Sequence, residues 1–228
     1  KTVFSAVVSY SVLSIVTLSP AFCTVIVPST GSIDTSPWFV AGVLIVVELP
    51  FIDTEILLSL PGSPIVYYGE ELGMKGIRAN GANGQYDETV RLPYVFGDSY
   101  ETSWVKDYNK YNSSIDNAPR QLANPDSLLN TYKTLLMLRN NNIALKYGNS
   151  IVKHNSATPQ LLAYTRTATY NNKTQTVLIV HNISKSALNM IECDGKVLYA
   201  SNGATTLEQL TQIPGRSTVI VDITGGSN

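Results

Sequence analysis

Residues 61–74, PGSPIVYYGEELGM, decide the fold that this sequence predicts. The turn-forming Pro-Gly-Ser-Pro leads into an apolar run at 65–68, which stops at Gly69 and is followed by the adjacent carboxylates Glu70 and Glu71. A short apolar run between turn residues is typical of a buried strand. Because sites form at the carboxyl ends of parallel strands, the stretch predicts an α/β region with an acidic loop where a strand ends.

The flanking residues continue the α/β pattern. Residues 53–60 predict a helix, and the β-branched run at 24–27 predicts a buried strand. Residues 38–47 are apolar throughout, so a strand and a buried helix both stay open. Residues 73–125 are polar and rich in Gly, Asn, Asp and Tyr. A loop of that length is usually functional or disordered, and its aromatic content argues against disorder.

A second helix is predicted from Asp126, which offers an N-cap, to Arg139. Apolar residues recur in it at three- and four-residue spacing, which indicates one buried face. That stripe consists of Leu128, Tyr132, Leu135, Leu136 and Arg139.

From Gly148 the apolar pattern changes to period two. Turn residues such as Asn171-Asn172 separate short runs, a spacing typical of an antiparallel sandwich or barrel. The predicted strands are 151–153, 161–167, 176–181, 188–192, 196–200 and 217–222. The sequence therefore predicts an α/β region at 1–147 with the long aromatic loop, followed by an all-β domain at 148–228.

Composition limits the partners of the chain. Its formal net charge is −1 and only 14% of its 228 residues are charged, which gives no electrostatic case for nucleic acid or an anionic membrane. The 13 tyrosines suit a neutral hydrogen-bonding ligand such as a sugar, although a low-charge soluble protein is the plainer interpretation. The length is below the roughly 250 residues of a complete eight-stranded α/β barrel.

The first residues have two interpretations. Lys1, the apolar run at 3–18 and the small residues after it have the layout of a secretory signal, which predicts a secreted or periplasmic protein. The alternative is that this segment forms core strand and helix of the domain. Cys23 and Cys193 would form a disulfide in an oxidising compartment, or stay as two free thiols.

Several strings occur in an order that resembles one family. They are residues 57–74, DETVRLP at 87–93, NPDSLLNTYKTLLMLR at 124–139, ALKYG at 144–148, and the strands of 161–221. Together, over residues 55–223, they resemble the α-amylase superfamily of glycoside hydrolases from the last barrel strand onward. The resemblance implies an incomplete or remodelled (β/α) barrel remnant, with 1–50 poorly matched, and a C-terminal antiparallel β-sandwich.

The resemblance also implies a chemistry. In that family two carboxylates cleave an α-glucosidic bond with retention, held about 5–5.5 Å apart, and a third carboxylate binds sugar hydroxyls. Asp34 matches the third position and is the candidate catalytic residue, although Ser32-Ile33 stand where the family has Asn-His. A turn or helix-cap aspartate is the alternative. Asp34 is also the first acidic residue, so nothing in this sequence matches the nucleophile or the acid/base.

Three further residues are candidates for glucan binding: Glu70, Arg91 and Trp104. Each has a structural alternative. Glu70 and Glu71 would instead bond loop backbone or pair with an arginine, Arg91 would pair with Asp87, and Trp104 would pack within its own domain. Activity would need missing sequence, a partner chain, or a non-standard carboxylate pair drawn from Asp34, Glu48, Asp53, Glu70 and Glu71.

Other signals are weak. His154 and His181 lie in predicted β structure and point to strand or surface placement rather than catalysis. No metal-ligand spacing or cofactor motif is present; the family resemblance allows calcium, without identifiable ligands. Asn112-Ser113-Ser114 fits the glycosylation pattern, which is short and often fortuitous.

Two functions follow. One is a truncated α-amylase-type glycoside hydrolase acting on starch and malto-oligosaccharides, and the other is a non-catalytic glucan-binding or structural fragment. Because an incomplete barrel exposes strand edges, we expect residues 3–47 or a second copy of the chain to cover them.

Overall fold

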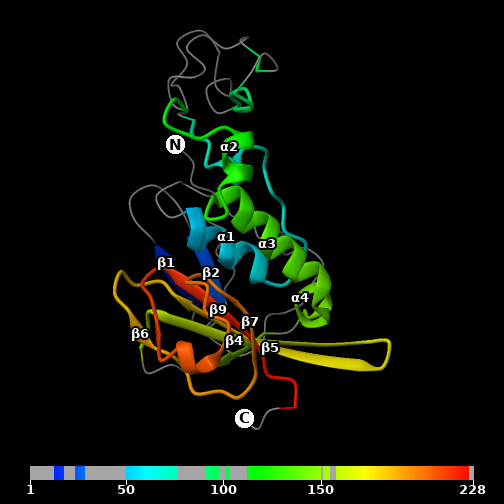
Figure 1. Ribbon diagram of the computed structural model, residues 1–228. Helices are drawn as coiled ribbons and strands as arrows, with labels where there is room; N and C mark the ends of the chain where they lie inside the picture. Colours follow the sequence, from blue (N-terminus) through cyan, green and yellow to red (C-terminus); the bar gives the residue numbers. More distant parts are fainter. Residues whose placement is uncertain are drawn as a thin grey trace.

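A computed structural model gives the arrangement of the chain (Figure 1). The structure describes residues 13–17, 24–28, 50–76, 91–97, 101–102, 112–149, 151–154 and 158–225. The helices are α1 (Pro50–Ser59), η1 (Glu70–Leu72), α2 (Ala118–Ala123), α3 (Leu128–Asn141), α4 (Ile143–Tyr147) and η3 (Leu207–Gln209). The strands are β1 (Leu13–Thr17), β2 (Thr24–Pro28), β3 (Ile151–His154), β4 (Leu161–Tyr170), β5 (Lys173–Asn182), β6 (Leu188–Asn189), β7 (Lys196–Ala200), β8 (Gln212–Ile213) and β9 (Ser217–Asp222).

The carboxyl-terminal region is built on a five-stranded antiparallel sheet in the order β3-β4-β5-β9-β7. Its longest hairpin, β4–β5, turns at Asn171 and Asn172, with φ of 49° and 60°. Two consecutive positive φ values are what a two-residue hairpin turn needs, and asparagine tolerates them. The strands predicted at 151–153, 161–167, 176–181, 196–200 and 217–222 are confirmed, and β4 and β5 run several residues beyond the predicted bounds. Of the strand predicted at 188–192, only 188–189 forms, as β6, which pairs with β8 outside this sheet.

The two faces of this sheet bury different cores. On β5, Leu178 and Val180 face a cluster completed by the β6–β8 pair and η3, whereas Val177 and Ile179 pack with Ala144 of α4. This alternation follows from the period of two along a strand. Figure 1 shows the helices on one side of the sheet and the β6 and η3 region on the other. The predicted sandwich stays a prediction.

The helices pack as a small layer against the sheet. Leu57 and Leu58 of α1 contact a stripe on α3 that includes Tyr132 and Leu135. The predicted stripe is confirmed except for Leu136, which is only partly buried. The predicted N-cap at Asp126 is wrong, because α3 begins after Ser127, whose Oγ accepts the Asn130 N–H at 3.2 Å.

Two buried arginines, Arg139 and Arg166, join the end of α1 to the sheet. Arg139 donates to the Leu60 carbonyl at 2.7 Å, and Arg166 donates to the Ser59 carbonyl at 2.7 Å and twice to the Gly148 carbonyl at 3.0 and 2.6 Å. The last carbonyls of a helix have no intrahelical donor and carry the negative end of its dipole. We use the name arginine joint for Arg139 and Arg166 together with the carbonyl groups to which they donate.

The predicted buried strand at 65–68 is wrong. The chain there has no regular structure, and Ile65 is 68% exposed. A strand forms only by pairing, and no strand in the described ranges pairs with this segment. The strand predicted at 24–27 is confirmed as β2, which pairs antiparallel with β1. All strand pairings among the residues that the structure describes are antiparallel, so the parallel barrel remnant stays a prediction.

The remaining fold predictions concern the long loop, the apolar run at 38–47 and the domain boundary. The loop predicted at 73–125 contains a helix, α2, which Asn117 caps by accepting the Arg120 N–H at 3.0 Å. The strand or helix predicted at 38–47 lies outside the described residues. The predicted division after residue 147 falls between α4 and β3, and separate folding of the two parts stays a prediction. Within the described ranges, every helix is too short or too polar to cross a bilayer.

Candidate functional site

The acidic turn that follows the 65–68 segment depends on two glycines. Gly69 and Gly73 flank η1 with φ of 87° and 74°, which side chains rarely adopt. A Cβ on Gly69 would also collide with the Met74 side chain. The glycines therefore allow the tight turn that presents Glu70 and Glu71 next to each other.

Both carboxylates of the turn bond its own backbone. Glu70 Oε2 accepts the Tyr67 N–H at 3.2 Å, and Glu71 Oε2 accepts the Gly69 N–H at 2.9 Å. Glu71 Oε1 accepts the Tyr94 hydroxyl at 2.8 Å, which ties the turn to the 91–97 segment. Burial raises the pKa of Glu70, and the charge of Glu71 raises it further. The loop-backbone role considered for these residues is thus present, and a glucan contact stays a prediction.

A third carboxylate lies close to the same place. Burial raises the pKa of Asp53 on α1 to about 6. Burial raises the pKa of Tyr132 to about 12, with smaller contributions from the charges of Glu70, Glu71 and Asp53. Three of the five carboxylates available for a non-standard pair therefore act electrostatically on one tyrosine. A carboxyl group that titrates near neutral pH is a candidate proton donor or acceptor.

Exposed aromatic rings lie beside the acidic turn. Tyr67 and Tyr68 are about half exposed, with ring centroids 4.8 Å apart. The Tyr68 hydroxyl donates to the Leu92 carbonyl at 3.1 Å, and the charge of the exposed Arg91 opposes the rise that burial causes in the pKa of Tyr68. The structure thus brings the backbone of Leu92, the neighbour of Arg91, into contact with Tyr68. Asp34 and Trp104 lie outside the described residues.

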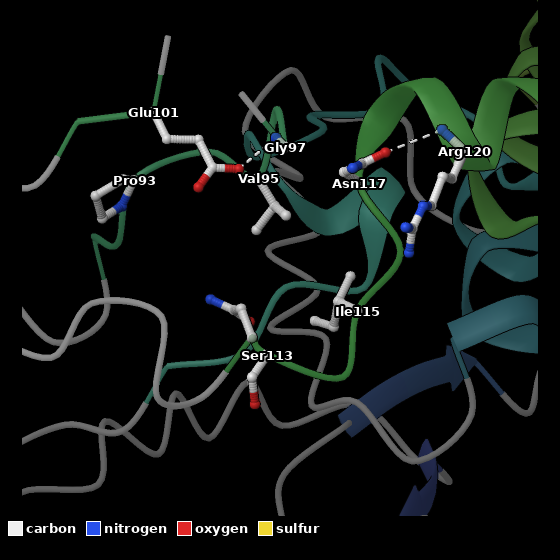
Figure 2. A pocket seen from close by; sticks show the side chains of 9 residues that line it. Pro93, Val95, Gly97, Glu101, Ser113, Ile115, Asn117 and Arg120 are labelled. Carbon is white, nitrogen blue, oxygen red and sulfur yellow. Dashed lines mark hydrogen bonds between the residues drawn. The ribbon is translucent and has the colours of Figure 1, made fainter. Parts of the chain in front are cut away.

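An open cleft of about 180 Å³ lies on the other side of the 93–97 segment (Figure 2). We call it the loop cleft. It is lined by Pro93, Val95, Gly97, Glu101, Asn112, Ser113, Ile115, Asn117 and Arg120. Sequence reasoning missed this cleft, because its two walls come from segments about twenty residues apart in a region without periodicity. Its lining combines amides, one hydroxyl, both signs of charge and three apolar side chains.

His181 forms a buried network that sequence reasoning also missed. Its Nε2 lies 3.2 Å from Ser59 Oγ and its Nδ1 lies 2.6 Å from Thr218 Oγ1. Tyr164 completes the network, with its hydroxyl 2.8 Å from Ser59 Oγ. Burial lowers the pKa of His181 to about 3, so the ring is neutral. Because His181 is fully buried on β5, substrate cannot reach it, and its predicted placement on a strand is confirmed.

Potential metal ligands and thiols can be placed for the part of the chain that the structure describes. No group of three or more His, Cys, Asp or Glu side chains is arranged there to hold a metal ion. Cys193 is a half-buried free thiol, whereas Cys23 lies outside the described residues.

Comparison with known proteins gives a consistent result. The family model for the catalytic domain of alpha amylase matches residues 51–148. The chain is 36% identical over 156 residues to Alpha-amylase SusG of Bacteroides thetaiotaomicron, covering 66% of this chain and 22% of that protein. It is 32% identical over 178 residues to Alpha-amylase 3 of Dictyoglomus thermophilum, covering 74% of this chain and 33% of that protein.

Two further matches complete the comparison. The Trehalose synthase/amylase TreS of Mycolicibacterium smegmatis is 29% identical over 189 residues, which is 71% of this chain and 30% of that protein. The crystal structure of an alpha-amylase from H. orenii superposes with a TM-score of 0.59 and 27% identity, covering 76% of this chain and 35% of that one. The chain thus spans between about a fifth and a third of the length of the curated relatives named here.

Proposed function

This chain belongs to the α-amylase superfamily of glycoside hydrolases, and we propose that it acts in the hydrolysis of α-glucans such as starch and malto-oligosaccharides. The observation that carries the proposal is the match of residues 51–148 to the catalytic domain of that family. The matched residues include Asp53, Glu70 and Arg91. Two relatives whose names give them as alpha-amylases support the same substrate class.

The proposed roles follow the chemistry of glycoside cleavage. Retention requires a nucleophile and an acid/base about 5–5.5 Å apart, together with groups that bind the sugar hydroxyls. In our proposal Asp34 binds sugar hydroxyls and supports the positive charge of the transition state. Glu70, Arg91 and Trp104 contact neighbouring glucose units. The nucleophile and the acid/base would be a non-standard pair drawn from Asp34, Glu48, Asp53, Glu70 and Glu71. Of these, Asp53 is 4% exposed, and burial raises its pKa to about 6.

Reducing-sugar release from soluble starch by the purified chain tests the proposal. Carboxymethylcellulose, which is β-linked, serves as the control substrate. We expect release from starch alone, and a fall of at least about tenfold for Asp34→Asn or Asp53→Asn. Glu192→Gln, which replaces an exposed carboxylate in the β region, should leave the rate unchanged. Release that none of these substitutions alters would reject the assigned residues, and equal release from both polymers would reject the substrate class.

A non-catalytic glucan-binding role is the second candidate. It is favoured by the carboxylate oxygens of Glu70 and Glu71, which already accept backbone and tyrosine hydrogen bonds. Retardation of the chain in a starch-containing native gel, without any sugar release, would support this role. Sedimentation of the same sample measures whether the chain self-associates, which covering of the exposed 65–68 segment by a second copy requires. A secreted or periplasmic location remains part of the proposal.

A further inference from the structure

The face of α1 that meets the sheet carries polar side chains. Glu55 and Ser59 lie about one helical turn apart, and each is 1% exposed. Ser59 Oγ lies 3.2 Å from His181 Nε2, and Glu55 accepts the Ser201 hydroxyl at 2.6 Å. Thr218 connects the two sides, because its N–H donates to Ser201 Oγ and its hydroxyl lies 2.6 Å from His181 Nδ1. Buried polar groups are stable only with their hydrogen bonds complete, so the contact of α1 with the sheet depends on this network.

The hydrogen bonds of Glu55 are divided unevenly between its two oxygens. Oε1 accepts the hydroxyls of Tyr199 and Ser201 at 2.7 and 2.6 Å, whereas Oε2 is buried and has no hydrogen-bond partner. Among the residues that the structure describes, no cationic side chain forms an ion pair with Glu55. Two donors occupy the lone pairs of Oε1, so a proton on this carboxyl group sits on Oε2. A carboxylate would instead leave negative charge on an oxygen that no donor reaches, and the geometry therefore favours the protonated form.

The elements packed against α1 bring other titratable and charged groups to this interior. They are Tyr132 and Arg139 of α3, Tyr164 and Arg166 of β4, His181 of β5, Tyr199 of β7 and Asp222 of β9. The two arginines donate to backbone carbonyls, and Asp222 accepts the Gln175 amide at 2.8 Å, so these charges have partners other than Glu55. Burial raises the pKa of all three tyrosines and lowers the pKa of His181 to about 3, which keeps these four groups neutral at pH 7. Asp53, on α1 itself, has a pKa of about 6 and needs its own control.

The direction of the pH response follows from the burial of Glu55. Burial raises the pKa of Glu55 above 4.5, and the smaller effect of its hydroxyl partners opposes that rise. A docked α1 therefore binds the proton more tightly than an α1 that has moved away from the sheet and exposed Glu55 to water. Docking is fully stabilised below pH 4.5 and weakens as pH rises through the raised pKa, by at most about tenfold per pH unit for one proton. His181 acts in the opposite sense, because its docking contribution is lost as pH falls from 6.5 towards 3.

We propose that the contact between α1 and the sheet is a pH-sensitive switch, in which loss of the Glu55 proton releases α1 from Tyr199 and Ser201 while the sheet stays folded. The strands of the sheet bond one another and do not need α1 for their pairing. A local opening of this kind costs less free energy than unfolding of the whole chain. The acidic turn follows α1 in the chain, so release of the helix also loosens the anchor of the candidate site.

Hydrogen–deuterium exchange of the whole chain, followed by mass spectrometry between pH 4.5 and pH 8, tests the switch. Each rate is divided into the intrinsic rate at the same pH to give a protection factor. We expect the protection factor of α1 in the parent, relative to that in Glu55→Gln, to fall at least about fivefold over this range. The comparison cancels the contributions of His181 and Asp53, which both proteins contain. In Asp53→Asn the fall that depends on Glu55 should persist.

Tyr199→Phe gives a second test that does not require Glu55→Gln to fold. The Tyr199 hydroxyl bond lowers the pKa of Glu55, so its removal should move the loss of α1 protection to higher pH. A purely structural role of Tyr199 would instead lower the protection by the same factor at every pH.

Urea separates local opening from unfolding of the whole chain. At pH 8, up to about 1 M urea should change the protection of α1 little, because a local opening exposes little surface, whereas the protection of β4 and β5 should fall with urea. Equal urea dependence of α1 and of these strands would mean that α1 opens only with the whole chain, and the switch is then overturned. A ratio of parent to Glu55→Gln protection that stays constant with pH overturns it as well, as does a Tyr199→Phe curve that runs parallel to the parent.

Discussion

Replacement of Arg166 by methionine measures what the arginine joint contributes to stability. Arg166 is 1% exposed, and its guanidinium bonds the carbonyls of Ser59, Leu60 and Gly148 at 2.6–3.2 Å. The Leu60 carbonyl keeps a donor in the variant, because Arg139 also bonds it at 2.7 Å. The carbonyls of Ser59 and Gly148 lose their arginine donors. Methionine fills most of the space of the aliphatic stem, so the variant removes mainly hydrogen bonds and charge.

Two opposing effects set the magnitude. Each buried carbonyl left without a donor costs about 1–3 kcal/mol, so the two together cost about 2–6 kcal/mol. Burial lowers the pKa of Arg166 from 12.5 to about 10. At about 1.4 kcal/mol per pH unit, removal of the buried charge returns at most about 3 kcal/mol. We therefore expect Arg166→Met to lower the free energy of unfolding by about 1–3 kcal/mol, and the unfolding midpoint by about 2–4 °C for each kcal/mol.

Arg166→Lys separates hydrogen bonding from charge. A lysine keeps a positive charge near the carboxyl end of α1, but one ammonium group cannot bond the carbonyls on both sides as the planar fork of arginine does. We expect Arg166→Lys to be destabilised at least as much as Arg166→Met. If the helix dipole alone mattered, lysine would restore the stability of the parent chain.

Urea unfolding at pH 7, followed by circular dichroism, gives the comparison. Lys133→Met, at an exposed position of α3, is the control and should stay within about 0.5 kcal/mol of the parent. The role of the joint is refuted if Arg166→Met unfolds at the same urea concentration as the parent, or if Arg166→Lys matches the parent.

Three further perturbations test the buried polar groups and the sheet core. Burial raises the pKa of Glu55 above 4.5, so the folded state holds the Glu55 proton more tightly than the unfolded state. The free energy of unfolding therefore falls as pH rises above 4.5. Glu55→Gln should flatten this part of the stability–pH curve, measured by urea unfolding. Burial lowers the pKa of His181 to about 3, so stability is lost as pH falls from 6.5 towards 3, and His181→Gln should move the midpoint of acid unfolding to lower pH. Leu178→Ala empties a fully buried site between the sheet and β8 and should cost about 2–5 kcal/mol in calorimetry, whereas Leu122→Ala at an exposed site of α2 should cost little.

The sheet could be predicted from the sequence because its information is local. Val177–Val180 on β5 are bounded by turn residues, and Asn171-Asn172 supply the two positive φ values that close the hairpin. The α3 stripe was likewise encoded in the spacing of Leu128, Tyr132 and Leu135. The N-cap was misplaced by one residue, because Asp126 and Ser127 are both good cap residues. In the structure Ser127 Oγ accepts the Asn130 N–H at 3.2 Å and donates to the Gln121 carbonyl at 2.7 Å.

The polar features of the interior could not be predicted in the same way. Ser59 and His181 are 122 residues apart in the sequence and 3.2 Å apart in space. Nothing local marks Arg166 as buried, since arginine on a strand is ordinarily solvated. Asn112 carried only a glycosylation pattern, and its unpartnered Nδ2 becomes visible when the Lys75 backbone and the cleft walls are in place. Such groups depend on partners that the fold brings together.

Glu70 shows how the failed strand prediction bears on function. The 65–68 run was predicted as a buried strand from its apolar residues, but burial and pairing belong to neighbours that no local pattern specifies. In the described structure the Tyr67 N–H is bonded by Glu70 Oε2, the place that a carbonyl of an adjacent strand would take. Glu70 Oε2 keeps a second lone pair, so a glucan hydroxyl can donate to it without displacing the Tyr67 N–H. The sugar contact predicted for Glu70 therefore does not depend on the strand predicted at 65–68, which the structure overturns.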